Sequence, residues 1–190
     1  MINIVLFGKP GAGKGTQAEF LKEKYNLTHL STGDIFRFNL KNDTELGKQA
    51  RVFMDNGELV PCEVTTAMLI DEVKKHPDTA GFLFDGYPRT INQAEALDKF
   101  LPTIGSNVTA TIALEADDEI LVKRLLERGK TSGRADDQDE EKIRVRYQEY
   151  NEKTAPLIGY YKEQGKFHAV DGIGTIEQIT ERLTSVIDNL

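Results

Sequence analysis

Cysteine is almost absent from this chain of 190 residues, which has one thiol, at Cys62. A single cysteine excludes an intramolecular disulfide. The chain also has only three histidines, so the ligands of a cysteine-rich zinc site are missing. We therefore expect a protein without zinc.

Positive charge and long apolar segments are scarce as well. The net charge of −7 argues against a nucleic-acid-binding protein, because such proteins are usually basic. No apolar run approaches the roughly 20 residues that cross a membrane, and no basic segment followed by an apolar signal core opens the sequence. These absences predict a soluble, cytoplasmic protein without nucleic-acid or membrane partners. A nucleotide ligand stays compatible with an acidic chain, since a local arginine cluster can bind it.

A glycine-rich segment stands between two regular elements near the start of the chain. Residues 8–16 read Gly-Lys-Pro-Gly-Ala-Gly-Lys-Gly-Thr, after the apolar run 2–7 and before a helical pattern. In a phosphate-binding loop the glycines let backbone N–H groups converge, and Lys14 reaches the outer phosphates of a nucleoside triphosphate. Gly15 stands where a hydroxyl residue is usual, and the hydroxyl follows at Thr16. A glycine-rich turn without function is the alternative, which these flanking elements disfavour.

Strands and helices alternate along the chain, which is typical of a parallel sheet covered by helices on both faces. The length suits one domain with small insertions, and no repeat or linker divides it. We expect strands at residues 2–7, 28–30, 82–84, 108–114 and 167–170. We expect helices at 14–25, 35–40, 45–56, 62–75, 91–100, 118–128, about 140–159 and 176–188, with Pro156 breaking the penultimate one.

Two segments depart from this simple alternation. Residues 31–60 hold two helices where one crossover would suffice. Residues 128–137 read Arg-Gly-Lys-Thr-Ser-Gly-Arg-Ala-Asp-Asp and predict a polar loop between two helices. Arginine-bearing loops beside a phosphate site are candidates for mobile closures of that site.

The strand at 82–84 ends in Asp85, which a P-loop sheet would place near the phosphates. There the carboxylate can hold magnesium, often through water, and the alternative is that it caps the turn at Gly86. The motif Gly86-Tyr87-Pro88-Arg89 follows, and we expect the Arg89 guanidinium to pair with phosphate oxygens two at a time. An exposed arginine in a surface turn is the alternative for Arg89.

Further arginines lie on the helices that follow. Arg124 and Arg128 are four residues apart and share one helix face, and Arg134 lies in the polar loop. Arg144 and Arg146 are two residues apart, so only one of them should face a cleft. Solvated ion pairs are the alternative for each, but phosphoryl transfer requires charge to be spread over several cations.

General bases are not apparent, because the three histidines lack a partner motif. A phosphate oxygen needs no base to act as a nucleophile, since it is already anionic. Positioning and electrostatics could then supply most of the catalysis.

Four motifs in this order make the chain resemble the adenylate kinase family, from Met1 to the last helix. They are the P-loop, Ser31-Thr32-Gly33-Asp34, Asp85-Gly86-Tyr87-Pro88-Arg89 and Ser132-Gly133-Arg134-Ala135-Asp136-Asp137. The variant Gly-Lys-Gly-Thr, which departs from the general P-loop pattern, is the form usual in that family. The resemblance implies a P-loop NTPase fold of three α/β/α layers with a five-stranded parallel sheet. Within the single domain 1–190 it implies a small helical AMP-binding insertion at 31–60 and a short lid at 127–137.

The resemblance also implies an activity, the reversible transfer of a phosphoryl group from Mg-ATP to AMP to give two ADP, and we expect a monomer. ATP would be held by Gly11, Ala12, Gly13, Lys14, Gly15, Thr16, Arg124, Arg128, Arg134 and Gly174. AMP and the transferring phosphate would contact Thr32, Arg37, Glu58, Leu59, Val60, Gly86, Arg89, Gln93, Arg134 and Arg146. The catalytic cations would be Lys14, Arg89, Arg128, Arg134 and Arg146.

Two details refine this expectation. Counting back from Thr154-Ala155-Pro156, which is also similar to the family, favours Arg146 over Arg144. The lid is of the short kind, which carries no four-cysteine zinc site. In it, Asp136 and Asp137 are expected to hold the guanidinium of Arg134 when no nucleotide is bound.

Two other functions stay open at the level of sequence. The UMP/CMP kinase family shares the fold, the P-loop and most of the arginines, but often has alanine where this chain has Thr32. Gln93, four residues after Arg89, takes the place of a glutamine that contacts the AMP base, although Thr90 with Gln93 also fits a helix capping box. A non-catalytic nucleotide switch belongs to another class, and it would need a water-activating residue and extended switch loops.

Overall fold

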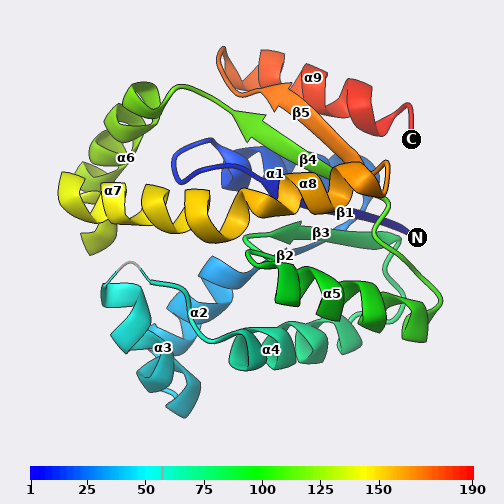
Figure 1. The fold of residues 1–190 in the computed structure, drawn as a ribbon, viewed down its shortest axis with the longest axis horizontal. Helices are drawn as coiled ribbons and strands as arrows, with labels where there is room; N and C mark the ends of the chain where they lie inside the picture. Colours follow the sequence, from blue (N-terminus) through cyan, green and yellow to red (C-terminus); the bar gives the residue numbers. More distant parts are fainter. Residues whose placement is uncertain (57) are drawn as a thin grey trace.

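The computed structural model describes residues 1–56 and 58–190. These residues form one sheet of five parallel strands in the order β2-β3-β1-β4-β5, with helices on both of its faces (Figure 1). The strands are β1 (Ile2–Phe7), β2 (Thr28–Ser31), β3 (Gly81–Asp85), β4 (Ala110–Glu115) and β5 (Phe167–Asp171). The predicted five-stranded α/β fold is therefore confirmed.

Helices occupy the connections between the strands, as the alternating pattern predicts. They are α1 (Lys14–Tyr25), α2 (Thr32–Lys41), α3 (Glu45–Asp55), α4 (Cys62–Lys74), α5 (Ile91–Phe100), α6 (Asp118–Ser132), α7 (Glu140–Glu149), α8 (Pro156–Glu163) and α9 (Ile176–Ile187). Short 3-10 turns lie at Leu101–Ile104 and Ala135–Asp137. The two helices expected in the 31–60 segment are α2 and α3.

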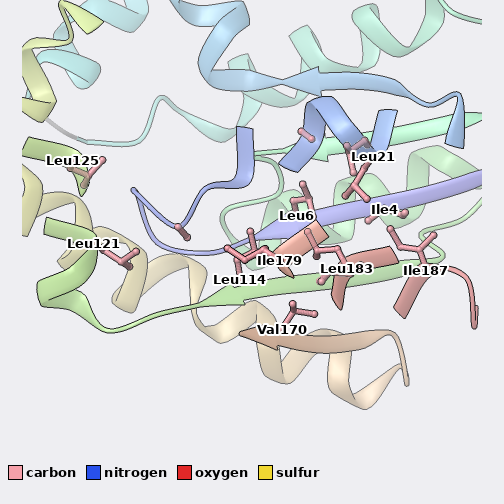
Figure 2. Packing of buried hydrophobic residues seen from close by; sticks show 14 of the residues in the cluster. Ile4, Leu6, Leu21, Leu114, Leu121, Leu125, Val170, Ile179, Leu183 and Ile187 are labelled. Atoms are coloured by element: carbon pink, nitrogen blue, oxygen red, sulfur yellow. The ribbon is translucent and has the colours of Figure 1, made fainter. Parts of the chain in front are cut away.

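Buried side chains of β1 alternate between the two faces of the sheet, because successive strand residues point to opposite sides. Ile4 and Leu6 belong to the cluster under α1, α6 and α9 (Figure 2), with Leu21, Leu114, Leu121, Leu125, Val170, Ile179, Leu183 and Ile187. Val5 and Phe7 belong to the cluster on the opposite face, with Leu69, Val73, Leu97, Leu101, Leu157 and Tyr161. The sheet is thus the middle layer of three.

A third and smaller hydrophobic cluster lies outside these two layers. Its buried members are Phe36 on α2, Ala50 on α3 and Val60 after them. The segment that carries α2 and α3 therefore has a core of its own, separate from the sheet.

The 128–137 segment differs from its prediction. Helix α6 continues to Ser132, so the expected loop over Arg128–Ser132 was wrong, and only the residues that follow leave the helix. Gly129 reads as a helix breaker in the sequence, yet it lies inside the helix. A glycine is needed at this position because a Cβ there would come within 2.6 Å of the Asp137 carbonyl oxygen. The residue that ends the helix is Gly133, whose φ of 67° is left-handed.

Two other boundaries differ for local reasons. Helix α2 begins at Thr32 rather than residue 35, because the Ser31 hydroxyl caps it by accepting a hydrogen bond from the Asp34 N–H at 3.3 Å. The helix expected over 140–159 is interrupted by a π-helical turn at Tyr150–Thr154 and resumes at Pro156, which confirms the predicted break.

The carboxyl ends of the parallel strands meet at one edge of the sheet. In Figure 1 this edge faces α6 and α7 on one side and α2 and α3 on the other, while both chain termini lie at the far end. Parallel sheets bind ligands at this edge. Within residues 1–56 and 58–190, no helix is long and apolar enough to cross a membrane.

Candidate active site

The loop after β1 contains glycines whose backbone lies in the left-handed region. Gly11 and Gly13 have φ of 86° and 91°, which side-chain-bearing residues rarely adopt. A Cβ on Gly11 would also lie 2.9 Å from the Leu121 carbonyl oxygen in α6. Gly13 then precedes α1, and among the described residues no side chain caps that helix start. Its backbone N–H groups are therefore available to an anion.

Lys14 begins α1 and folds back over the loop. Its ammonium donates hydrogen bonds to the carbonyl oxygens of Gly8 at 2.6 Å and Lys9 at 3.2 Å. Burial lowers the pKa of Lys14 to about 8; Asp85 opposes this shift, whereas three arginines reinforce it, namely Arg89, Arg146 and Arg128. An anion placed among these groups would relieve their mutual repulsion.

Asp85 lies at the end of β3 beside the start of α1, where a Cβ on Gly15 would be 4.0 Å from its Oδ2. Burial alone would raise the pKa of Asp85, but the net shift is downward because His29, Lys14 and Arg89 stabilise the carboxylate. The His29 Nε2 lies 3.6 Å from Asp85 Oδ2. The carboxylate is therefore ionised and can hold a cation.

A magnesium ion bound with a nucleotide fits this position. Magnesium prefers oxygen ligands and usually keeps several waters, so one carboxylate together with phosphate oxygens suffices. A metal held by the protein alone needs more ligands, and in the described part of the chain no three His, Cys, Asp or Glu residues gather for one. Asp85 thus suits a metal that arrives with its substrate.

Arg89 is fixed by hydrogen bonds along both its side chain and its backbone. Its Nε donates to the Gly86 carbonyl oxygen at 2.7 Å, its N–H to Gln93 Oε1 at 2.7 Å, and its carbonyl accepts from Thr154 Oγ1 at 2.9 Å. A Cβ on Gly86, whose φ is 78°, would lie 2.8 Å from Arg89 Nη2. Burial lowers the pKa of Arg89, so its charge is held in a poorly solvated position.

Gln93 does not complete the capping box that its spacing from Thr90 suggests. The Thr90 hydroxyl accepts from the Gln93 N–H at 3.3 Å, but the Gln93 side chain accepts from Arg89 instead of Thr90. Gln93 is buried and lines the cleft together with Thr32, whose hydroxyl donates to the Gly86 carbonyl oxygen at 2.9 Å. Both residues therefore connect the cleft to the backbone around Arg89.

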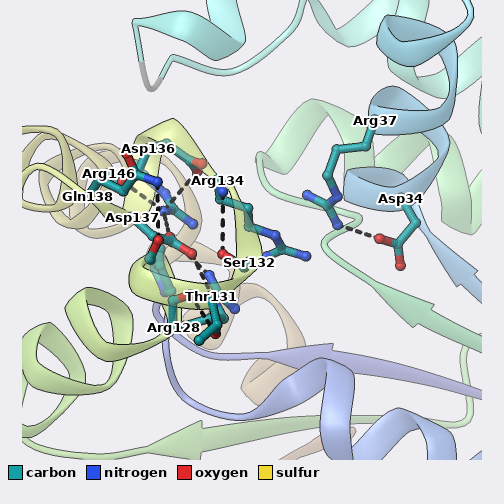
Figure 3. A network of polar contacts seen from close by, with 12 residues as sticks. Asp34, Arg37, Arg128, Thr131, Ser132, Arg134, Asp136, Asp137, Gln138 and Arg146 are labelled. Atoms are coloured by element: carbon teal, nitrogen blue, oxygen red, sulfur yellow. Dashed lines mark hydrogen bonds and ion pairs between the residues drawn. The ribbon is translucent and has the colours of Figure 1, made fainter.

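The cleft lies between the P-loop, α2, the end of β3 and α7. Many of the predicted site residues line it, namely Lys14, Thr32, Arg37, Glu58, Leu59, Val60, Gly86, Arg89, Gln93 and Arg146. Arg37 projects from α2 and pairs with Asp34 (Figure 3).

Asp137 joins two of the predicted arginines (Figure 3). Its side chain is fully buried, and it accepts from Arg128 Nε at 2.6 Å and Nη2 at 3.0 Å, and from Arg146 Nη1 at 2.8 Å. Asp136 adds an ion pair to Arg146 at 2.9 Å. The pKa of Asp137 is lowered, because the two arginines outweigh the effect of burial. Arg144, by contrast, pairs with exposed glutamates away from the cleft.

Arg134 is not held as the sequence suggested. In the described part of the chain, Asp136 and Asp137 pair with Arg128 and Arg146, and neither carboxylate pairs with the Arg134 guanidinium. The Arg134 side chain instead extends toward Arg37 on α2 (Figure 3). Burial and the like charge of Arg37 lower the pKa of Arg134. The expected Arg134 pairs were wrong because Asp137 faces inward, toward α6 and α7.

Arg124 and Gly174 lie apart from these cations, near the end of β5. The Arg124 guanidinium donates to the Gly172 carbonyl oxygen at 3.2 and 3.3 Å. Gly174 has φ of 134° and precedes the capping box that Thr175 and Gln178 form at α9. Arg124 and Gly174 therefore lie at the β5 end of the sheet, whereas α2 follows β2 at the opposite end.

Sequence reasoning missed several groups of the site. Glu149 and Tyr150 line the cleft, and their spacing of three and four residues from Arg146 on a helix could have indicated this. The contact between His29 and Asp85 and the burial of Asp137 depend on how distant elements pack, so no local pattern announces them.

Comparisons with known proteins agree with this geometry. A family model described as adenylate kinase matches residues 6–166. The chain is 96% identical to an adenylate kinase of Flavobacterium johnsoniae and 76% identical to one of Flavobacterium psychrophilum. It is 47% identical to an adenylate kinase of Bacteroides fragilis. Each comparison covers 100% of this chain and 100% of the relative.

Proposed function

Because the chain belongs to the adenylate kinase family, we propose that its cleft transfers a phosphoryl group reversibly between Mg-ATP and AMP, giving two ADP. The protein is accordingly an enzyme, a nucleoside monophosphate kinase of the transferase class. The observation that carries the proposal is the convergence of Lys14, Arg89 and Arg146 beside the ionised Asp85.

On the ATP side, the P-loop and Lys14 bind the phosphates. The N–H groups of residues 11–16 would surround the β-phosphate, as in other P-loops, and the Lys14 ammonium would exchange its two carbonyl partners for phosphate oxygens. Arg128 would contact the same phosphates, and Arg124 with Gly174 would border the base. Asp85 would hold magnesium through water, and the bound ion would neutralise charge on the phosphates.

On the AMP side, Arg37 and Arg89 grip the phosphate, and the wall formed by Glu58, Leu59 and Val60 lines the nucleoside. Gln93 and Thr32 face the base. The Gln93 side-chain oxygen already accepts from the Arg89 N–H, which leaves its amide N–H groups to donate to an acceptor on the base. Because pyrimidines also carry acceptors, the preference for adenine rests on the likeness of Thr32 and Gln93 to the AMP site of the family.

The transfer itself needs no protein base in this arrangement. The attacking oxygen of AMP is anionic, so the cations have only to bring two phosphates into line and stabilise the charge that spreads between them. Lys14, Arg89, Arg128 and Arg146 supply that charge from fixed positions. Arg134 would join them from the lid.

We assign residues 31–60 to AMP binding and residues 127–137 to a lid, and expect both to close over the nucleotides. Two adenosines joined by five phosphates should occupy both sites, so amide hydrogen exchange should slow in both segments while β1 changes little. Unchanged exchange in both segments at saturating ligand would mean a preformed, rigid site and would contradict closure.

A panel of nucleoside monophosphates assayed with Mg-ATP tests the function. Coupled detection of ADP should show a strong preference for AMP over CMP and UMP. Equal rates on AMP and CMP would indicate a pyrimidine kinase, and binding without ADP formation would indicate a switch. Arg146→Ala should lower turnover by about 100-fold, whereas the matched Arg144→Ala should leave it nearly unchanged.

The enzyme would act as a cytoplasmic monomer. Support comes from the site, which one chain completes, and from the lack of a membrane-spanning helix in the described residues. Light scattering after size exclusion measures the mass directly, and a dimer mass would contradict this assignment.

A further inference from the structure

One side chain of the P-loop does not point to the phosphate site. The Lys9 ammonium lies 2.7 Å from Asp118 Oδ1, in the first turn of α6, and 5.6 Å from the ring centroid of Tyr147 on α7. The Tyr147 hydroxyl donates to the carbonyl oxygen of Pro10 at 3.4 Å. Lys9 and Pro10 are therefore attached to both helices that precede and follow the lid.

The backbone of Lys9 is a meeting point of contacts within the P-loop. Its carbonyl oxygen accepts from the Ala12 N–H at 3.1 Å, which closes the turn, and from the Lys14 ammonium at 3.2 Å. A displacement of Lys9 would therefore move both a phosphate-binding turn and the lysine that reaches the phosphates.

The attachment is well placed to resist such a displacement. Tyr147 is 4% exposed, and burial raises its pKa to about 12, so its hydroxyl keeps the proton that it donates. The side chains of Lys9 and Asp118 are 21% and 46% exposed, so solvent screens their pair in part but less than it screens a fully solvated pair. Both helices also carry phosphate-directed arginines, Arg128 on α6 and Arg146 on α7.

We infer that Lys9 is a positioning residue that fixes the P-loop relative to α6 and α7 and thereby places Lys14 for the phosphates of ATP. This inference rests on the proposed function, because it assigns the P-loop to ATP. Its effect should fall mainly on the ATP side, since most of the residues assigned to AMP lie on α2, after α3 and after β3, none of which Lys9 contacts within the described residues.

Lys9→Met tests the inference, because it removes the charge and keeps most of the stem. We expect the KM for ATP and the Kd for Mg-ATP, measured by calorimetry without AMP, to rise about three- to ten-fold. The KM for AMP should change less than two-fold. Lys9→Arg should restore ATP binding, because a guanidinium can pair with Asp118 and stack on Tyr147.

A matched control exists at the other end of the molecule. Lys24 pairs with Asp188 at 2.9 Å and lies 5.0 Å from the ring centroid of Tyr25, so Lys24→Met breaks the same kind of triad far from the cleft. It should leave both nucleotide constants unchanged. Equal effects of the two substitutions on ATP, or equal weakening of ATP and AMP by Lys9→Met, would overturn the inference.

A second variant guards against misfolding. Asp118→Asn should reproduce part of the ATP effect, and the double variant should be no worse than Lys9→Met alone, because Lys9→Met already removes the pair with Asp118. Additive effects would overturn the inference. If the unaltered protein fails to bind Mg-ATP, the proposed function fails instead, so the two failures are distinguishable.

Discussion

Lys14 is expected to weaken the nucleotide-free fold while it serves the reaction. Its pKa falls from 10.5 to about 8 because burial disfavours the charged form. At about 1.4 kcal/mol per pKa unit, this shift corresponds to a penalty of about 3 kcal/mol on the folded state. The penalty is complete below about pH 8, where Lys14 is charged in both states, and disappears toward pH 10.5, where both states lose the proton.

Lys14→Met removes this penalty at neutral pH. The variant also loses two hydrogen bonds, to the carbonyl oxygens of Gly8 and Lys9, which together offset about 2 kcal/mol. The net expectation is a stabilisation of about 1 kcal/mol at pH 7, or a Tm higher by about 2–4 °C for a domain of this size. Turnover should nevertheless fall by about 100-fold or more, because a cation directed at the phosphates is gone.

Urea denaturation of both nucleotide-free proteins at pH 7 and pH 9.5 measures the effect. The difference in unfolding free energy should favour the variant at pH 7 and shrink at pH 9.5, as the native lysine deprotonates. Lys14→Arg is the matched control, because it keeps a charge at both pH values and should give no stabilisation. A variant less stable than the original at pH 7, or a difference that ignores pH, would refute the reasoning.

Three further changes test the rest of the site. Asp137→Asn should destabilise the protein by about 2 kcal/mol at pH 7, because Arg128 and Arg146 lose their shared partner. The pKa of Asp137 is lowered in the folded state, so its contribution to stability is present above about pH 3.9 and is lost as the pH falls through the folded-state pKa. The urea midpoints of the two proteins should therefore converge in acid, and a difference that stays constant with pH would contradict this expectation. Gln93→Ala should raise the KM for AMP about ten- to a hundred-fold and leave the KM for ATP unchanged. An unchanged KM for AMP would mean that Gln93 only accepts the hydrogen bond from the Arg89 backbone and does not contact the base. Chelation should abolish activity and magnesium should restore it, with no tightly bound zinc in elemental analysis; one zinc per chain would contradict this expectation.

The fold was predictable because its signals are local. Apolar strands followed by helical patterns specify a parallel sheet whatever its exact neighbours, and all five strands lie within two residues of their predicted bounds. The end of α6 was not predictable in the same way. Gly129 breaks the sequence pattern, and only the close approach of the Asp137 backbone explains why a glycine stands inside that helix.

In the candidate site, too, the local features were predictable and the contacts between distant elements were not. The spacing from Gly8 to Lys14 indicates a P-loop, since one turn and one helix contain the whole motif. The partners of its charges depend on packing between distant elements, which spacing does not encode. For that reason Asp137 was expected beside Arg134, its neighbour in sequence, and instead lies between Arg128 and Arg146.

The small cluster of Phe36, Ala50 and Val60 separates two properties of the molecule. We expect resistance to heat to depend mainly on the two large clusters around the sheet, because they hold most of the buried hydrophobic side chains. The α2–α3 segment has three buried side chains that those clusters do not include. Substitutions in the small cluster are therefore expected to change the local stability of this segment more than the cooperative unfolding of the sheet.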